Sequence, residues 1–157
     1  MATFDERDFL QLDPDAIRAR IKLLDGFALD PDKSTLGIKI TSEAGDHFGE
    51  FKLQKVTESR TALSKGLLSD DLLGTEYTLK LATQSKDEFR KLQSFVGKGR
   101  PGQVTIFVAP ILSSFPKDAS TTNVWIDLLF SKEQGYFTLL EGAEVPMEGI
   151  RAANAGR

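Results

Sequence analysis

Apolar and polar residues alternate with a period of two in several short stretches of this chain, which is the pattern of half-buried β-strands. Leu36, Ile38 and Ile40, for example, alternate with small or polar residues. The polar, glycine-containing connection that follows them predicts a hairpin to the next stretch. The predicted strands are residues 36–41, 48–57, 77–81, 103–109, 123–130 and 136–140.

Residues 14–25 have helical features instead. Asp13, placed directly before a proline, is a typical N-cap residue because its carboxylate can accept hydrogen bonds from free backbone amides. Ile17, Ile21 and Leu24 follow at spacings of four and three and form one apolar stripe. We therefore predict a helix over residues 14–25.

A second helix is predicted to begin directly after Ser85. Ser85 and Glu88 have the Ser-x-x-Glu spacing of a capping box. Phe89, Leu92 and Val96 then form the apolar stripe of an amphipathic helix. A glycine directly after this stripe is expected to end the helix.

Together these elements predict a single α+β domain, and the 157 residues of the chain are the length of one typical domain. We expect a mainly antiparallel sheet of about six strands. The sheet is expected to curl into a partly closed barrel with both helices packed on it. Residues 1–147 form the expected domain, and residues 148–157 form a polar C-terminal tail. Residues 60–74 are expected to be a short helical turn or an ordered loop on the core.

Charge and cysteine content limit the classes of partner. The chain has 20 Lys and Arg residues and 23 Asp and Glu residues, a net charge of −3, which argues against broad attraction to nucleic acid or anionic lipid. The absence of cysteine excludes disulfides, thiolate nucleophiles and Cys-ligated metals. No apolar run approaches the roughly 18 residues of a membrane span, and the first residues do not resemble a secretory signal. We therefore expect a cytoplasmic protein without a membrane partner.

The sequence contains no common catalytic motif. A nucleophile elbow, a phosphate-binding P-loop and a dinucleotide-binding glycine pattern are all missing. His47 beside Asp46 is expected to lie exposed in a turn and to have no catalytic role, and there is no second histidine to share a metal. We expect no catalytic residue, no metal and no cofactor. An enzyme that uses carboxylates, with or without a metal, stays as the second alternative.

The strand predicted at residues 123–130 is apolar on both faces, because Trp125 alternates with Val124 and Ile126. Such a strand is central in a sheet, covered by helices, or part of an interface. This favours a non-catalytic protein-binding or assembly protein that binds a protein partner or associates with itself as a homo-oligomeric structural component. The candidate partner-binding residues are Phe115, which lies in a polar loop, Trp125 and Phe130.

The first alternative is a nucleic-acid-binding module. Residues 86–100 contain five basic residues and two acidic ones. The glycine-containing loop after the second helix could hold phosphate, although cations near a helix C-terminus also complement the helix dipole. The candidate nucleic-acid-binding residues are Arg90, Lys91, Lys98 and Arg100.

Overall fold

A computed structural model of the chain describes residues 2–42, 45–63, 72–96 and 102–148. Its main element is an eight-stranded sheet with the order β1-β7-β4-β5-β6-β2-β9-β10, and a separate pair is formed by β3 and β8. All pairings are antiparallel. The strands are β1 (Ala2–Asp5), β2 (Arg18–Leu24), β3 (Ala28–Leu29), β4 (Thr35–Ser42), β5 (Gly45–Leu63), β6 (Leu72–Leu81), β7 (Gln103–Ala109), β8 (Leu112–Ser114), β9 (Thr121–Leu129) and β10 (Tyr136–Pro146). The helices are α1 (Glu6–Leu10) and α2 (Thr83–Val96).

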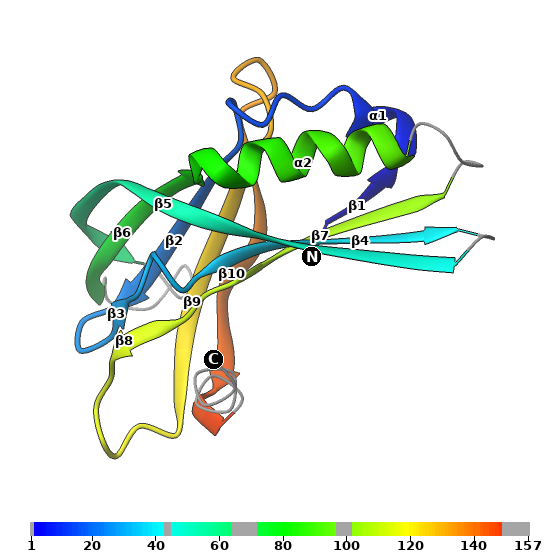
Figure 1. Ribbon diagram of the computed structural model, residues 1–157. Helices are drawn as coiled ribbons and strands as arrows, with labels where there is room; N and C mark the ends of the chain where they lie inside the picture. Colours follow the sequence, from blue (N-terminus) through cyan, green and yellow to red (C-terminus); the bar gives the residue numbers. More distant parts are fainter. Residues whose placement is uncertain (1, 43–44, 64–71, 97–101, 149–157) are drawn as a thin grey trace.

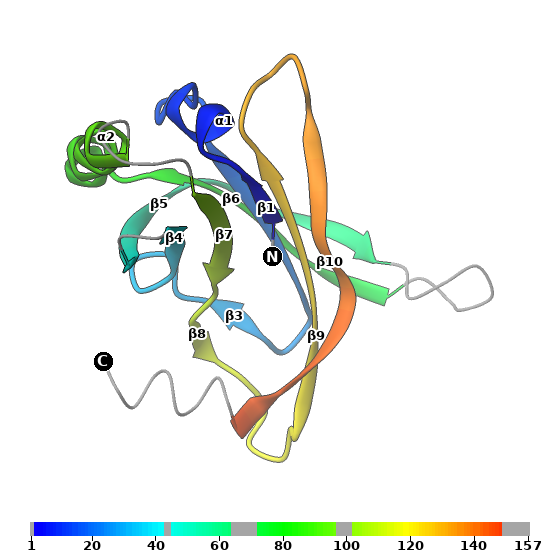
Figure 2. The ribbon, with the colours of Figure 1, turned by 90° about the vertical axis from the view of Figure 1, so that its right-hand side faces the viewer.

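The main sheet curls around one apolar interior but does not close, because β1 and β10 stand at opposite ends of the strand order. Figures 1 and 2 show both helices at one end of this half-barrel and the β3–β8 pair at the other. The predicted α+β fold with a mainly antiparallel, partly closed barrel is confirmed. All six predicted strands are present, and the sheet is larger than expected because β1 and β2 join them.

Alternate residues of β2, β4 and β7 face the core, as the period-two pattern predicts. In β4, for example, Leu36, Ile38 and Ile40 are at most 3% exposed. Both helices contribute one aromatic ring each: Phe9 of α1 and Phe89 of α2 are fully buried, with ring centroids 5.4 Å apart. Phe89 also meets Phe51 of β5 at 5.4 Å, so these rings connect the helices to the sheet.

The predicted helix over residues 14–25 is wrong, because Arg18–Leu24 form strand β2. β2 lies between β6 and β9, and its buried and half-buried residues alternate. The apolar spacing of Ile17 and Ile21 fits both a helix and a strand, and pairing with two distant strands decides the outcome. The carboxylate of Asp13 accepts a hydrogen bond from the backbone N–H of Asp15, which forms a turn before β2 instead of a helix cap.

The second predicted helix is confirmed as α2, although it begins at Thr83 and not after Ser85. Ser85 is buried inside the first turn, where its Oγ accepts a hydrogen bond from the backbone N–H of Lys52. The capping-box prediction is therefore wrong, since this hydroxyl satisfies a strand amide. The stripe itself is confirmed: Phe89 and Val96 are buried, and Leu92 packs partly buried against the core.

Two other predictions fall at the margins of the described residues. Residues 60–63 belong to β5, and residues 72–74 belong to β6. The expected helical turn or loop over residues 60–74 is therefore wrong for these seven residues. The remaining residues, 64–71, lie outside the described part of the chain. Residues 149–157 of the predicted tail also lie outside it. Neither of the two described helices is long and apolar enough to cross a membrane.

The aromatic contact between α2 and the sheet predicts a large difference between two phenylalanines of one helix. Phe89→Ala should lower the free energy of unfolding by about 3–5 kcal/mol, because it removes a fully buried ring. Phe95→Ala, at a position that is 52% exposed and whose ring meets the His47 ring at 4.3 Å, should change it by about 1 kcal/mol or less. Urea denaturation of the two variants and the wild type measures both values. Equal losses would contradict the assigned packing of α2.

Candidate functional site

Two phenylalanine rings stack on the outer face of the sheet, across strand β4. Leu36, Ile38 and Ile40 face the core, so Gly37 and Lys39 face outward. Phe48 of β5 pairs with Lys39, and Phe107 of β7 pairs with Gly37. The rings of Phe48 and Phe107 lie 5.8 Å apart and nearly parallel, at an interplanar angle of 25°.

Gly37 is the residue that makes this stacking possible. A Cβ atom on Gly37 would lie 2.3 Å from Cζ of Phe107, so the Phe107 ring occupies the space directly over the glycine. Phe48 rests on this ring and is nevertheless 60% exposed. Beside the rings, the Nζ of Lys39 lies 3.8 Å from a carboxylate oxygen of Asp46. We call Gly37, Lys39, Asp46, Phe48 and Phe107 the aromatic surface.

The same β4–β5 hairpin carries an aromatic contact on its other face. The His47 ring meets the Phe95 ring of α2 edge-on, with centroids 4.3 Å apart. His47 is half-buried and lies within β5, where it pairs with Ile40, so its expected place in a turn is wrong. Phe95 is 52% exposed. Two exposed aromatic side chains, Phe48 of β5 and Phe95 of α2, therefore lie on opposite faces of this hairpin. Figure 1 shows the ribbons of β4, β5 and α2.

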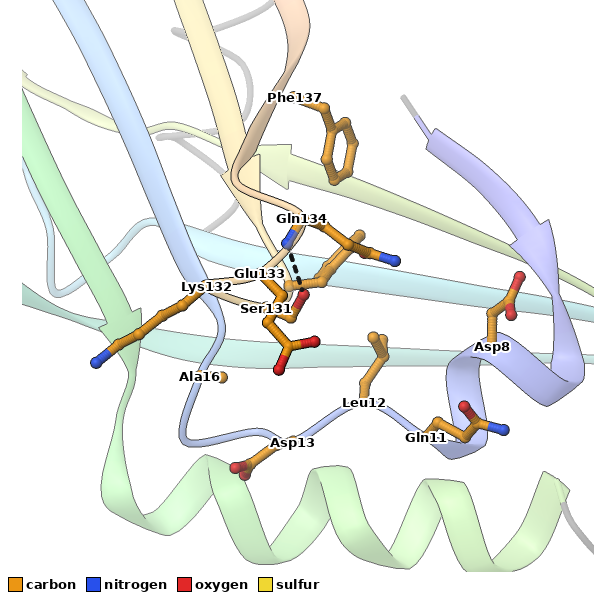
Figure 3. A pocket seen from close by; sticks show the side chains of 11 residues that line it. Asp8, Gln11, Leu12, Asp13, Ala16, Ser131, Lys132, Glu133, Gln134 and Phe137 are labelled. Atoms are coloured by element: carbon orange, nitrogen blue, oxygen red, sulfur yellow. Dashed lines mark hydrogen bonds between the residues drawn. The ribbon is translucent and has the colours of Figure 1, made fainter.

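A pocket of about 840 Å³ lies at the end of the half-barrel where α1 is found. Its walls come from α1, from the segment between α1 and β2, and from the turn between β9 and β10 (Figure 3). We call it the end pocket. It is lined by Asp8, Gln11, Leu12, Asp13, Ala16, Phe130, Ser131, Lys132, Glu133, Gln134 and Phe137.

The end pocket combines an apolar floor with acidic groups. Leu12, Phe130 and Phe137 supply apolar surface, and the rings of Phe130 and Phe137 are 5.2 Å apart. Asp8, Asp13 and Glu133 supply three carboxylates, none of which forms an ion pair with a described residue. Figure 3 shows the Glu133 carboxylate near the middle of the pocket and the Lys132 side chain extending away from it. The pocket is therefore suited to a group that is both apolar and positively charged.

The candidate partner-binding residues lie in three different places. Phe130 is 8% exposed and lines the end pocket. Phe115 is half-buried and packs against the core. It precedes the nine-residue strand β9, whereas Phe130 follows it, so these two residues lie at opposite ends of the strand. Trp125 lies within β9 and is 7% exposed. Their part in binding a partner stays a prediction.

The two apolar faces of β9 are both covered within this chain. Val124, Ile126 and Leu128 belong to the core. On the other face the Trp125 ring lies against Gly142 of β10, where a Cβ atom would come within 3.1 Å of Trp125. Gly142 has a φ of +68°, in the left-handed region that favours glycine, next to an irregularity in the β9–β10 register. The indole of Trp125 is thus covered by a local bend of the neighbouring strand.

Sequence reasoning missed a polar network next to Trp125. Asp127 is only 9% exposed, although it lies in this apolar strand. Its carboxylate accepts hydrogen bonds from Arg20 at 3.0–3.1 Å and from the Thr138 hydroxyl at 2.9 Å. Arg20 also lies 3.6 Å from Glu76, and its guanidinium stands 4.0 Å above the Tyr136 ring. These contacts satisfy a buried carboxylate and tie β2 to β9 and β10.

The candidate nucleic-acid-binding residues are only partly described. Arg90 forms ion pairs with Asp15 at 3.5 Å and with Asp87 at 3.9 Å, and Lys91 is exposed. Lys98 and Arg100 lie outside the described residues. A third cation of the helix, Lys86, pairs with Asp15 at 2.8 Å. Two of the described cations of α2 are therefore paired with carboxylates of this chain.

Described residues provide no cluster of three or more histidine, cysteine, aspartate or glutamate side chains that could hold a metal ion. Comparisons with protein-family models, with curated proteins and with solved structures find no match to this chain. We therefore infer its function from the geometry of the aromatic surface and the end pocket.

The pair between Asp15 and α2 predicts a pH-dependent contribution to stability. The hydrogen bond and charge of Lys86, with a smaller effect of Arg90, lower the pKa of Asp15 below its usual value of 3.8. A lowered carboxyl pKa stabilises the folded state above the pKa of the unfolded chain, and this contribution is lost as the pH falls through the folded pKa. Asp15→Asn should therefore lower the urea midpoint slightly at neutral pH, and the difference from wild type should shrink below about pH 4.

Asp118→Asn is the matched control, because Asp118 is an exposed loop residue for which no ion pair with a described residue occurs. Its midpoint should follow that of the wild type at every pH. A difference for Asp15→Asn that grows as the pH falls would contradict the assigned ion pair.

Proposed function

We propose that this chain is a non-catalytic protein-binding and assembly domain that associates with itself through the aromatic surface, as a homo-oligomeric structural component in the cytoplasm. The observation that carries the proposal is the exposed stack of Phe48 on Phe107. The zero cysteine content agrees with a cytoplasmic location.

An exposed phenylalanine held rigidly on a sheet is well suited to an interface. Phe48 needs little further ordering, because the Phe107 ring and the strand below it already fix its position. Moving the exposed 60% of this side chain from water into a packed interface contributes roughly 1–2 kcal/mol per copy. Aromatic residues of this kind are enriched among the few residues that dominate binding energy.

The charges beside the rings favour a second copy of the same chain as the partner. Lys39 and Asp46 give the aromatic surface one cation and one anion. In a two-fold arrangement each copy presents the same surface, so Lys39 of one copy can face Asp46 of the other while the rings meet in the middle. A nucleic acid would require an excess of cations, which this surface does not have.

The two edges of the sheet are less suitable for association. β1 has only four residues, and the pairing of β10 is irregular at two places and ends at Pro146. Short strands, bulges and prolines are the usual features that prevent sheet edges from pairing with other chains. We therefore propose association through the face of the sheet.

Phe48→Lys tests the proposal, with Val56→Lys as its matched control. Val56 is 46% exposed on the same strand but lies outside the aromatic surface. The wild type and Val56→Lys should form multimers at micromolar concentration. Phe48→Lys should dissociate them, because a loss of about 3 kcal/mol weakens association more than a hundredfold. The mass is measured by light scattering after size exclusion. A monomeric wild type, or a Phe48→Lys multimer of unchanged mass, would refute the proposal.

A further inference from the structure

We propose that the end pocket of one copy binds residues 149–157 of a second copy, with Ile150 on its apolar floor and Arg151 between its carboxylates. This inference rests on the proposed function, because it requires copies of the chain to associate. The aromatic surface would join copies in pairs, and the end pocket would connect such pairs into larger assemblies.

The side chains that line the end pocket complement residues 149–157 in charge and apolar character. Asp8 and Glu133 line the pocket beside a floor made by Leu12 and Phe130, whereas Asp13 lies at its margin, where its carboxylate accepts a hydrogen bond from the Asp15 N–H. This environment favours a large apolar side chain directly beside a cation. Phe137, which is 36% exposed at the pocket, adds a ring face over which a guanidinium can lie.

Among the segments outside the described residues, only 149–157 has this chemistry. It contains Ile150 directly before Arg151, a second arginine at 157, and no acidic residue. Residues 64–71 contain two aspartates and one lysine, and residues 97–101 contain no large apolar side chain. The net charges of residues 149–157 and of the pocket are opposite.

The course of β10 prevents residues 149–157 from reaching the end pocket of their own copy. β10 begins beside the end pocket and runs to Pro146 at the opposite end of the half-barrel (Figures 1 and 2). From Phe137 to Pro146 this distance is about 30 Å at the usual rise of a strand. Met147 is fixed there: its side chain is 1% exposed and its N–H donates to the Ser120 carbonyl. Ile150 follows three residues later and can reach only about 10 Å further.

Disulfide trapping in the 157-residue chain tests the contact, since this chain has no cysteine. One chain carries Ala16→Cys in the pocket, and a second chain with a mass tag carries Ile150→Cys. Mixed under mild oxidation, they should give a crosslinked heterodimer on a non-reducing gel, because bound partners bring the two Cα atoms within bridging distance. The control pairs Ile150→Cys with Val56→Cys and should give about tenfold less product.

Charge reversal checks the assigned ion pair. Glu133→Lys in the Ala16→Cys chain should lower the yield of heterodimer about tenfold, and Arg151→Glu in the tagged chain should restore it. Glu144→Lys is the control, since Glu144 is an exposed residue of β10 that does not line the pocket. It should leave the yield unchanged.

The outcomes separate this inference from the proposed function. A heterodimer yield no higher than that of the Val56→Cys control, or one unaffected by Glu133→Lys, would overturn the pocket contact. If the multimer then still depends on Phe48, self-association through the aromatic surface stands without it. If the trapped heterodimer forms but Phe48→Lys leaves the mass unchanged, the pocket contact stands and the aromatic interface fails.

Discussion

The rest of the structure depends on the packing of Phe89 between Phe9 of α1 and Phe51 of β5. The sheet is open, because its first and last strands do not pair with each other, so hydrogen bonding alone cannot enclose its apolar inner face. The two helices supply the missing cover at one end through these rings. At the other end, Leu29 of β3 and Leu112 of β8 complete the same core.

Both proposed contact surfaces follow from this arrangement. The short α1 and the segment after it cross the open end of the sheet and meet the β9–β10 turn, which creates the end pocket. With the inner face filled by core residues, large side chains on the opposite face stay exposed unless a neighbouring strand covers them. Gly142 of β10 bends against Trp125, whereas no comparable strand of the described chain covers Phe48.

The sequence predicts those parts of the fold that depend on local pattern. Leu36, Ile38 and Ile40 alternate because one face of β4 is core, and this is visible without knowing the partners of the strand. The spacing of Ile17 and Ile21 fits both a helix and a strand. The strand forms because this segment pairs with β6 and β9, which lie far away in sequence. The aromatic surface was not predictable for the same reason: Phe48 and Phe107 meet only because β4 separates their strands and carries Gly37 between them. Phe130 was identified from its strand, but Asp8 and Asp13, which line the end pocket with it, come from a segment that is far away in sequence.

Hydroxyl-radical footprinting at increasing protein concentration tests the central claim most directly, because it reports the exposure of individual side chains. Phe48 should become several times less reactive as the chain associates, while Tyr136, which is 36% exposed and lies outside both contact surfaces, should keep its reactivity. If Phe48 stays as reactive at high concentration as at low concentration, the aromatic surface does not join copies of this chain.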